Sequence, residues 1–104
     1  MKSGNSDLGQ YIRVLRKEME ETLHQVSRDT DIDSPMLSKI ERGERLPTTD
    51  QIKKIAKHFK VAENSLLSKL TAEKIIRDFG ANEVTLDAIS IVKEEIVKYV
   101  KLRK

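Results

Sequence analysis

Residues 22–47, with the sequence TLHQVSRDTDIDSPMLSKIERGERLP, decide the fold because they contain the start and stop signals of two short helices. The tetrapeptide Thr22-Leu-His-Gln25 fits a capping box, in which the Thr and Gln side chains satisfy two backbone donors at a helix start. This helix is expected to end near Thr30. Asp31 then suits the turn, because Asp is among the few non-glycine residues that tolerate a left-handed conformation.

A second helix is expected directly after this turn. Asp33 can cap it, Pro35 is tolerated in a first turn whose N–H groups have no helical partner, and Gly43 ends it. Leu37 and Ile40 lie on the side expected to face a core. Two short helices joined by a three- or four-residue turn have the spacing of a helix-turn-helix, which on its own is a weakly specific signal.

The rest of the chain also predicts helices, since apolar residues recur three and four positions apart and no stretch shows sustained polar–apolar alternation. The fold class is therefore expected to be all-α, with a five-helix domain in residues 1–70 and a helical extension in residues 71–104. The further helices are expected over about Leu8 to Met19, Thr48 to Phe59, Glu63 to Lys69, Thr71 to Phe79 and Leu86 to Arg103.

Composition excludes several classes of function. The 104 residues include no cysteine, which rules out disulfides, thiol catalysis and cysteine-based zinc sites, and two lone histidines cannot build a metal site. We recognise no nucleophile–base set and no phosphate loop, so we expect neither an enzyme nor a cofactor. Because the sequence has no long apolar run and no signal-peptide pattern, we expect a cytoplasmic protein that does not enter a membrane.

The net charge of +3 is small, but its distribution along the chain is uneven. Residues 18–33 carry six acids against one base, whereas residues 34–60 carry seven bases against three acids. A run of like charges is ordinarily a solvated helix face, so the basic segment indicates DNA only if its geometry fits.

The segment Leu37-Ser-Lys-Ile-Glu-Arg-Gly-Glu-Arg-Leu-Pro47 strongly resembles the signature of the recognition helix and its sequel in the Xre/Cro family of repressor-like DNA-binding domains. The resemblance extends over residues 8–68 and includes the Ile12-Arg-x-Leu15-Arg16 opening and the Val61 to Leu67 ending. It implies a five-helix domain that inserts its third helix into the major groove and binds palindromic operators as a dimer.

The third helix of such a domain must present hydrogen-bonding or apolar side chains to base edges. Lys39 can donate to guanine, the two serines can contact bases or phosphates, and the apolar side chains can pack on a thymine methyl. The resemblance implies base reading at Ser34, Pro35 and Lys39 in particular, although Lys39 could also be an ordinary exposed lysine. The full set of expected readers is Ser34, Pro35, Met36, Ser38 and Lys39.

Phosphate contacts are expected at two places. Thr22 begins a helix whose N-terminal N–H groups and dipole attract anions, and His24 could add a hydrogen bond there, although a lone histidine is as readily incidental. Arg42 and Arg45 follow the recognition helix, and guanidinium groups can bind two phosphate oxygens at once. The alternative for both is a solvated loop arginine.

The resemblance also implies a partly buried ion pair between Arg16 and Glu41, which would brace the first helix against the recognition helix without contacting DNA. The chain departs from the family at Leu23, where many members have a glutamine that reaches the DNA backbone. Together with the acidic residues 18–33, this departure predicts moderate affinity that depends steeply on salt and on the pairing of two copies.

The final helix carries apolar residues over roughly 240° of its circumference, which is wide for a helix packed on one partner. We therefore expect it to form a homodimer with the same helix of a second subunit. Packing on its own domain and binding a different protein, such as a toxin, are the alternatives. The expected dimerisation residues are Ile89, Val92, Ile96, Tyr99 and Val100.

These observations favour a sequence-specific regulator, by preference a transcriptional repressor, that binds double-stranded DNA as a homodimer. Two alternatives stay open. One is an antitoxin that autoregulates its operon while its tail neutralises a toxin, and the other is an interaction module whose helix-turn-helix has lost DNA binding. A regulator of a restriction-modification system or a mobile element is equally compatible with the sequence.

Overall fold

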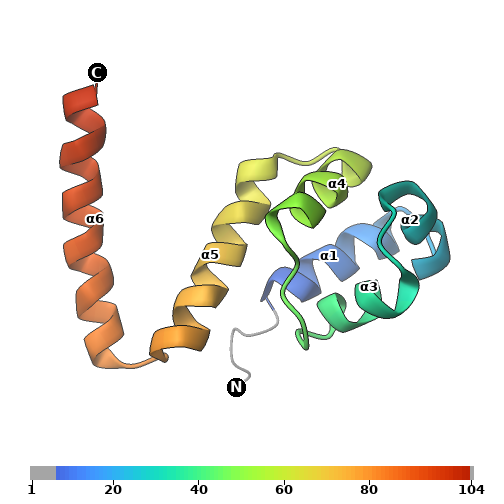
Figure 1. Ribbon diagram of the computed structural model, residues 1–104, viewed down its shortest axis with the longest axis horizontal. Coiled ribbons are helices and arrows are strands. Elements are labelled where there is room, and N and C mark those ends of the chain that lie inside the picture. Colours follow the sequence, from blue (N-terminus) through green and yellow to red (C-terminus); the bar gives the residue numbers. More distant parts are fainter. Residues whose placement is uncertain (1–6, 104) are drawn as a thin grey trace. The chain divides into compact units, whose positions relative to one another are not determined.

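The computed structural model describes residues 7–103, which form six α-helices (Figure 1). The helices are α1 (Asp7–Glu18), α2 (Leu23–Thr30), α3 (Ser34–Glu41), α4 (Thr49–Phe59), α5 (Glu63–Phe79) and α6 (Glu83–Arg103). The predicted all-α fold is confirmed, and residues 7–103 contain no strand. No helix in this range is both long and apolar enough to cross a membrane.

The chain divides into two compact units, one through Lys74 and one from Ile75 onward, so α5 spans their boundary. In the first unit α1 packs on α3, and α2 packs on both α3 and α4. The helices α1 to α5 each contribute apolar residues three or four positions apart to a single core. The most deeply buried of these residues are Leu8, Ile12, Val26, Leu37, Ile40, Ile52, Ile55, Leu66 and Leu70.

Gly9 sets how closely α1 approaches α3. A Cβ atom at this position would lie 2.7 Å from the carbonyl oxygen of Glu41 and closer still to that of Ile40. Both obstacles are backbone atoms, which cannot rotate away as a side chain can. The two helices can therefore adopt this spacing only because residue 9 has no side chain.

Two expected helices after residue 62 are a single helix. We predicted a short helix over Glu63 to Lys69 and another capped by Thr71, but α5 runs unbroken through both. The Thr71 hydroxyl donates a hydrogen bond to the Leu67 carbonyl at 2.9 Å, one turn back, so it bonds within the helix instead of capping a new one.

The helix α6 begins three residues before the predicted Leu86. Asn82 provides the cap that the sequence analysis missed, since its side-chain oxygen accepts a hydrogen bond from the Thr85 backbone N–H at 2.9 Å. Gly80 has a φ of 92° and terminates α5.

Candidate nucleic-acid interface

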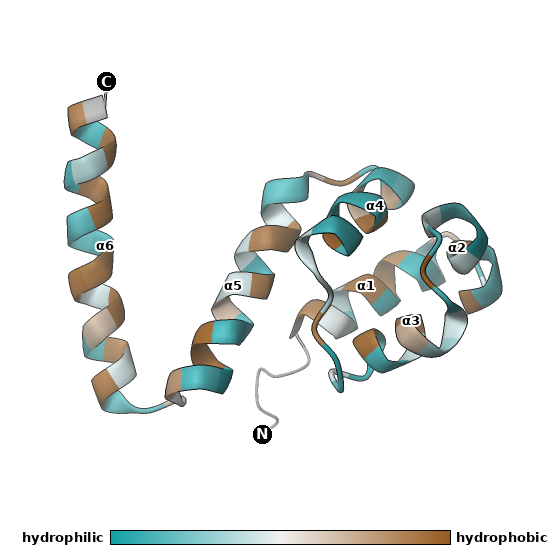
Figure 2. Cartoon of the chain, viewed as in Figure 1, coloured by the Kyte–Doolittle hydropathy of each residue, from teal (hydrophilic) through white to brown (hydrophobic). Residues whose placement is uncertain are grey.

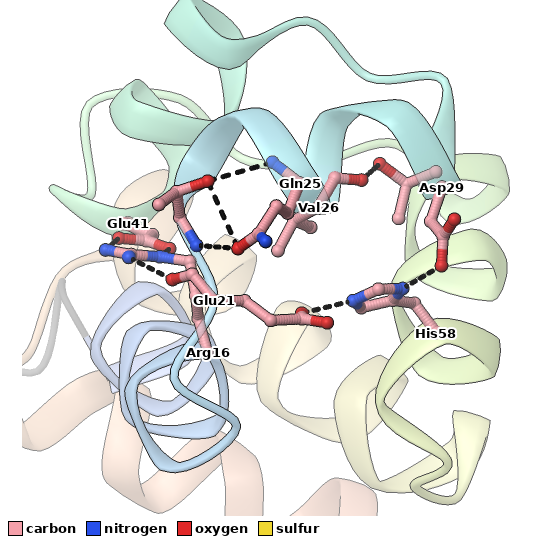
Figure 3. Close-up of polar contacts among 9 residues, drawn as sticks. Arg16, Glu21, Gln25, Val26, Asp29, Glu41 and His58 are labelled. Atoms are coloured by element: carbon pink, nitrogen blue, oxygen red, sulfur yellow. Dashed lines mark hydrogen bonds and ion pairs between the residues drawn. The ribbon is translucent and has the colours of Figure 1, made fainter.

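The start of α2 is fixed by the predicted capping box. The Thr22 hydroxyl accepts a hydrogen bond from the Gln25 backbone N–H at 3.1 Å, and the Gln25 side-chain oxygen accepts one from the Thr22 N–H at 2.7 Å (Figure 3). Thr22 and His24 are exposed, whereas Leu23 is half-buried against the core. The N–H groups of Leu23 and His24 stay outside the helical ladder, where the positive end of the helix dipole favours an anion.

A three-residue turn joins α2 to α3. Asp31 is left-handed, as predicted, with a φ of 63°, and its N–H donates to the Ser27 carbonyl at 2.9 Å. Ile32 is buried in the core, and the Asp33 carboxylate accepts a hydrogen bond from the Met36 N–H at 2.8 Å. The angle between the two helices is thus held by an apolar anchor in the middle of the turn and a cap at its end.

The helix α3 exposes two of the predicted base readers to solvent. Leu37 and Ile40 are each 1% exposed, so they fix the helix on the core. Pro35 and Lys39 are exposed. Because the inner face is buried this completely, a ligand can approach α3 only from the outer side on which Pro35 and Lys39 lie.

The other three predicted readers are placed less favourably. Ser34 and Ser38 are half-buried. Met36 is also half-buried, and it packs against the core. Its side chain is therefore partly withdrawn from the surface to which we assigned it.

Arg42, which we expected at a phosphate, has partners within its own chain. Its Nε and Nη2 atoms donate to the two carboxylate oxygens of Glu44 at 2.8 and 3.1 Å, and Nη1 donates to the Ser38 hydroxyl. These hydrogen bonds hold the pKa of Glu44 below its ordinary value and raise the pKa of Arg42. Both side chains are about half exposed, and Arg45 is exposed as well.

Arg16 in α1 and Glu41 at the end of α3 form a bidentate ion pair that is mostly buried (Figure 3). Arg16 Nε and Nη2 donate to the two carboxylate oxygens of Glu41 at 2.8 and 2.9 Å, which is the contact that the resemblance implied. The side chains are 12% and 5% exposed, and the hydrogen bond to Glu41 raises the pKa of Arg16. Arg16 Nη1 also donates to the Glu21 carbonyl at 2.9 Å. One guanidinium therefore joins α1 to the segment before α2 and to the end of α3.

His58 on α4 was not singled out as structural in the sequence. Its Nδ1 lies 2.9 Å from an Asp29 carboxylate oxygen, and its Nε2 lies 2.6 Å from one of Glu21 (Figure 3). Only 5% of the His58 side chain is exposed. Two of the six acids in residues 18–33, which we expected to oppose DNA, are thus engaged by an imidazole.

Across residues 7–103 no group of three or more His, Asp and Glu side chains is arranged to hold a metal ion. The surface around α3 includes one exposed lysine, two arginines, small hydroxyl side chains and helix N–H groups, together with the exposed acids Asp31, Asp33 and Glu44. The lysine, arginine, hydroxyl and N–H groups donate hydrogen bonds to base edges and phosphates.

A family model described as helix-turn-helix matches residues 12–66, a range that contains α2, the turn and α3. No curated protein sequence matches the chain significantly. Among solved structures, the clp gene regulator ClgR from Corynebacterium glutamicum has the same fold, with a TM-score of 0.58 and 14% sequence identity. The match covers 98% of this chain and 95% of that chain.

Proposed function

Because the chain belongs to the Xre/Cro-type helix-turn-helix family of DNA-binding transcription regulators, we propose that it is a repressor that binds a palindromic operator as a homodimer. The seating of α3 carries the proposal. Leu37 and Ile40 bury one side of this helix, while Pro35 and Lys39 stand exposed on the other. A rigidly held helix with an exposed outer side is what the major groove accommodates.

Base reading rests on few side chains. Lys39 donates to guanine O6 and N7, and the ring of Pro35 packs on a thymine methyl. Ser34 and Ser38 add hydroxyls from their half-buried positions. The half-buried Met36 is assigned a smaller part, because its side chain already packs against the core.

Phosphate binding comes from both sides of the reading helix. The start of α2 offers the backbone N–H groups of Leu23 and His24 to a phosphate. Thr22 is exposed beside them at the same helix end. Arg42 and Arg45 follow α3, and the Arg42 guanidinium changes partner from Glu44 to a phosphate oxygen when DNA is bound. These contacts orient the protein and carry little sequence information.

A single copy has too few readers to select one site in a genome, and we therefore assign residues 71–104 as the dimerisation extension. The exposed apolar side chains of α6 support this assignment, among them Ile89, Val92, Ile96 and Val100. A twofold dimer places two reading helices about 34–36 Å apart, one turn of DNA, which matches a palindrome. Repression then requires only that the bound dimer occupies promoter DNA.

Selection of bound sequences from random DNA at about 150 mM salt tests the proposal. Enrichment of an inverted repeat with half-sites about ten base pairs apart supports a dimeric operator binder. Enrichment of a single half-site contradicts the dimer and leaves DNA reading in place. A pool with no enriched sequence contradicts DNA reading itself and favours a helix-turn-helix that only contacts proteins.

A further inference from the structure

His58 in α4 lies between two carboxylates that belong to opposite ends of α2. Its Nε2 is 2.6 Å from an oxygen of Glu21, just before the helix, and its Nδ1 is 2.9 Å from an oxygen of Asp29, in the last turn (Figure 3). All three residues belong to the first compact unit, and only 5% of the His58 side chain is exposed. The imidazole therefore bridges both ends of α2 to α4.

The helix α2 has few apolar side chains that can hold it on the core. Most of its eight residues are hydrophilic (Figure 2). Val26 is buried, and Leu23 is half-buried against the core. We therefore expect the two carboxylate contacts with His58 to contribute to the position of α2.

The two contacts together require a doubly protonated ring. A neutral imidazole has one N–H donor and one acceptor nitrogen, and an ionised carboxylate only accepts hydrogen bonds. With carboxylates at both nitrogens, a neutral ring leaves one nitrogen lone pair facing a carboxylate oxygen. An imidazolium donates to both carboxylates, and each hydrogen bond is then strengthened by charge. The geometry at His58 thus fits the charged form of the ring.

The proton on His58 determines the net charge of this cluster. Within residues 7–103, the hydrogen bonds and ion pairs of the ring are confined to the two carboxylates. Phe59 packs edge-on against the ring, with 4.7 Å between the ring centres. The basic neighbours along α2 and α4 are exposed, namely Arg28, Lys54 and Lys57, and Lys54 pairs with Asp50 at 3.5 Å. Two carboxylates and one imidazolium carry one net negative charge, which becomes two when the ring is neutral.

We propose that the bridge formed by Glu21, His58 and Asp29 regulates phosphate binding at the start of α2 through the proton on His58. This inference rests on the proposed function and adds a pH dependence to it. The charged ring holds both ends of α2 on α4. When the Nδ1 proton is lost, Asp29 turns to water, because its side chain is already 70% exposed, while the Nε2 N–H keeps its contact with Glu21.

Loss of the proton weakens DNA binding for two reasons. Glu21 directly precedes Thr22, so the additional negative charge lies next to the proposed phosphate site and repels a phosphate. The release of Asp29 also frees the last turn of α2 from α4. Affinity therefore falls as the pH rises from about 5 to 8, the range in which imidazoles ordinarily change charge. A single charge about 8 Å from a phosphate in water changes affinity about two- to threefold.

Nitrogen NMR of the imidazole rings tests the protonation of His58 without DNA. At the acidic end of this pH range, both ring nitrogens of His58 are expected to carry protons. At the basic end, the proton at Nε2 is expected to remain. A ring that has a single proton throughout the range, or that loses the Nε2 proton first, overturns the proton-dependent bridge.

Operator affinity at two pH values tests the regulation. His24→Gln leaves His58 as the only histidine of the chain, and in this background affinity is expected to be about two- to threefold weaker at about pH 8 than at about pH 5.5. Addition of His58→Gln supplies an amide donor for Glu21 without a proton that titrates, and should remove the difference. A background affinity that does not change with pH, or a change that survives His58→Gln, overturns the regulation.

An exposed position provides an independent test, because His58→Gln alters a buried one. Asp29→Asn removes a carboxylate that stabilises the imidazolium, and its amide can donate to the neutral Nδ1. This variant should move both the NMR transition of His58 and the loss of affinity to lower pH. Asp31→Asn removes an exposed acid that has no contact with the ring, and should leave both where they are. Equal shifts in the two variants, or no shift in Asp29→Asn, overturn the proposal.

The two kinds of measurement separate this inference from the proposed function. A chain whose His58 shows the expected loss of the Nδ1 proton, but which selects no DNA sequence, contradicts the proposed function and leaves the bridge standing. A chain that binds its selected operator equally at both pH values contradicts the regulation and leaves DNA reading standing.

Discussion

Glu73 in α5 accepts a hydrogen bond from the backbone N–H of Leu8 at 2.7 Å, although 65 positions separate the two residues. Leu8 belongs to the first turn of α1, where backbone N–H groups have no helical partner. Only 4% of Glu73 is exposed, so a carboxylate inside the domain caps the helix that seats α3. The anchor of the reading helix thus includes a residue outside the helix-turn-helix.

Removal of this cap is expected to destabilise the domain. Glu73→Ala leaves the buried Leu8 N–H without its acceptor. We expect the free energy of unfolding, measured in urea, to fall by about 1–3 kcal/mol. Glu94→Ala, which removes an exposed acid from α6, is the matched control and should stay within about 0.5 kcal/mol of wild type. Equal losses in the two variants would show that Glu73 is no cap.

The pair of Arg16 and Glu41 is expected to act on stability and only indirectly on DNA. Glu41→Ala leaves a mostly buried guanidinium unpaired and should cost about 3 kcal/mol. The double variant Arg16→Met with Glu41→Leu should recover part of this loss. Once DNA affinity is corrected for the folded fraction, it should match wild type, and a residual loss in Glu41→Ala would indicate a direct contact with DNA.

The two acids beside His58 are expected to differ in their contribution. The side chain of Glu21 is 22% exposed and that of Asp29 is 70% exposed, so water screens the second contact far more. Glu21→Ala should lower the free energy of unfolding by about 1 kcal/mol, and Asp29→Ala by less than about half of that. Thermal and urea unfolding measure both, and the reverse order would contradict this ranking.

Lys39 is expected to determine operator sequence. Lys39→Ala should reduce the preference for the selected operator over random DNA by about 1–3 kcal/mol, because a base contact is lost. Lys74→Ala removes the same charge from an exposed position in α5 and should leave the preference unchanged. Fluorescence anisotropy with both DNAs measures the ratio, and equal losses on both DNAs would contradict base reading by Lys39.

Arg42 and Glu44 are expected to affect DNA affinity in opposite directions. Arg42→Ala should weaken all sequences and flatten the dependence of log affinity on log salt by about one unit. Glu44→Gln frees the guanidinium and should raise affinity about two- to fivefold. Without Arg42, the pKa of Glu44 should rise toward its ordinary value, which an NMR titration detects. In the wild type, the ion pair between Arg42 and Glu44 is fully formed at pH values above the ordinary pKa of Glu44. It is lost as the pH falls through the lowered pKa of Glu44.

Structural features that depend on residues close together in the sequence could be predicted. The predicted capping box of Thr22 with Gln25 forms, and so does a second one of Thr48 with Gln51, and each joins residues three positions apart. The left-handed Asp31 follows from its own side chain in the same way. Short-range signals of this kind carry enough information to place α2, α3 and α4.

Contacts between distant residues could not be predicted. His58 meets acids 29 and 37 positions away, and no local pattern distinguishes it from a surface histidine. Thr71 could be read as a cap or as an interior helical residue, and the packing of the buried Leu70 beside it favours the continuous α5. Met36 was predicted to contact DNA because of its position, and the packing of its half-buried side chain against the core could not be predicted from that position.

The close contact at Gly9 determines which substitutions can change the DNA specificity of this chain without moving α3. Gly9 in α1 lies against the backbone of α3. The position of α3 on the domain therefore does not depend on the side chains that α3 exposes. We therefore expect that exchange of Pro35 and Lys39 for other side chains alters the DNA sequence that is bound and leaves the position of α3 unchanged. A single methyl group at residue 9 would have the opposite effect, because it would shift the whole of α3 and leave every reader chemically intact.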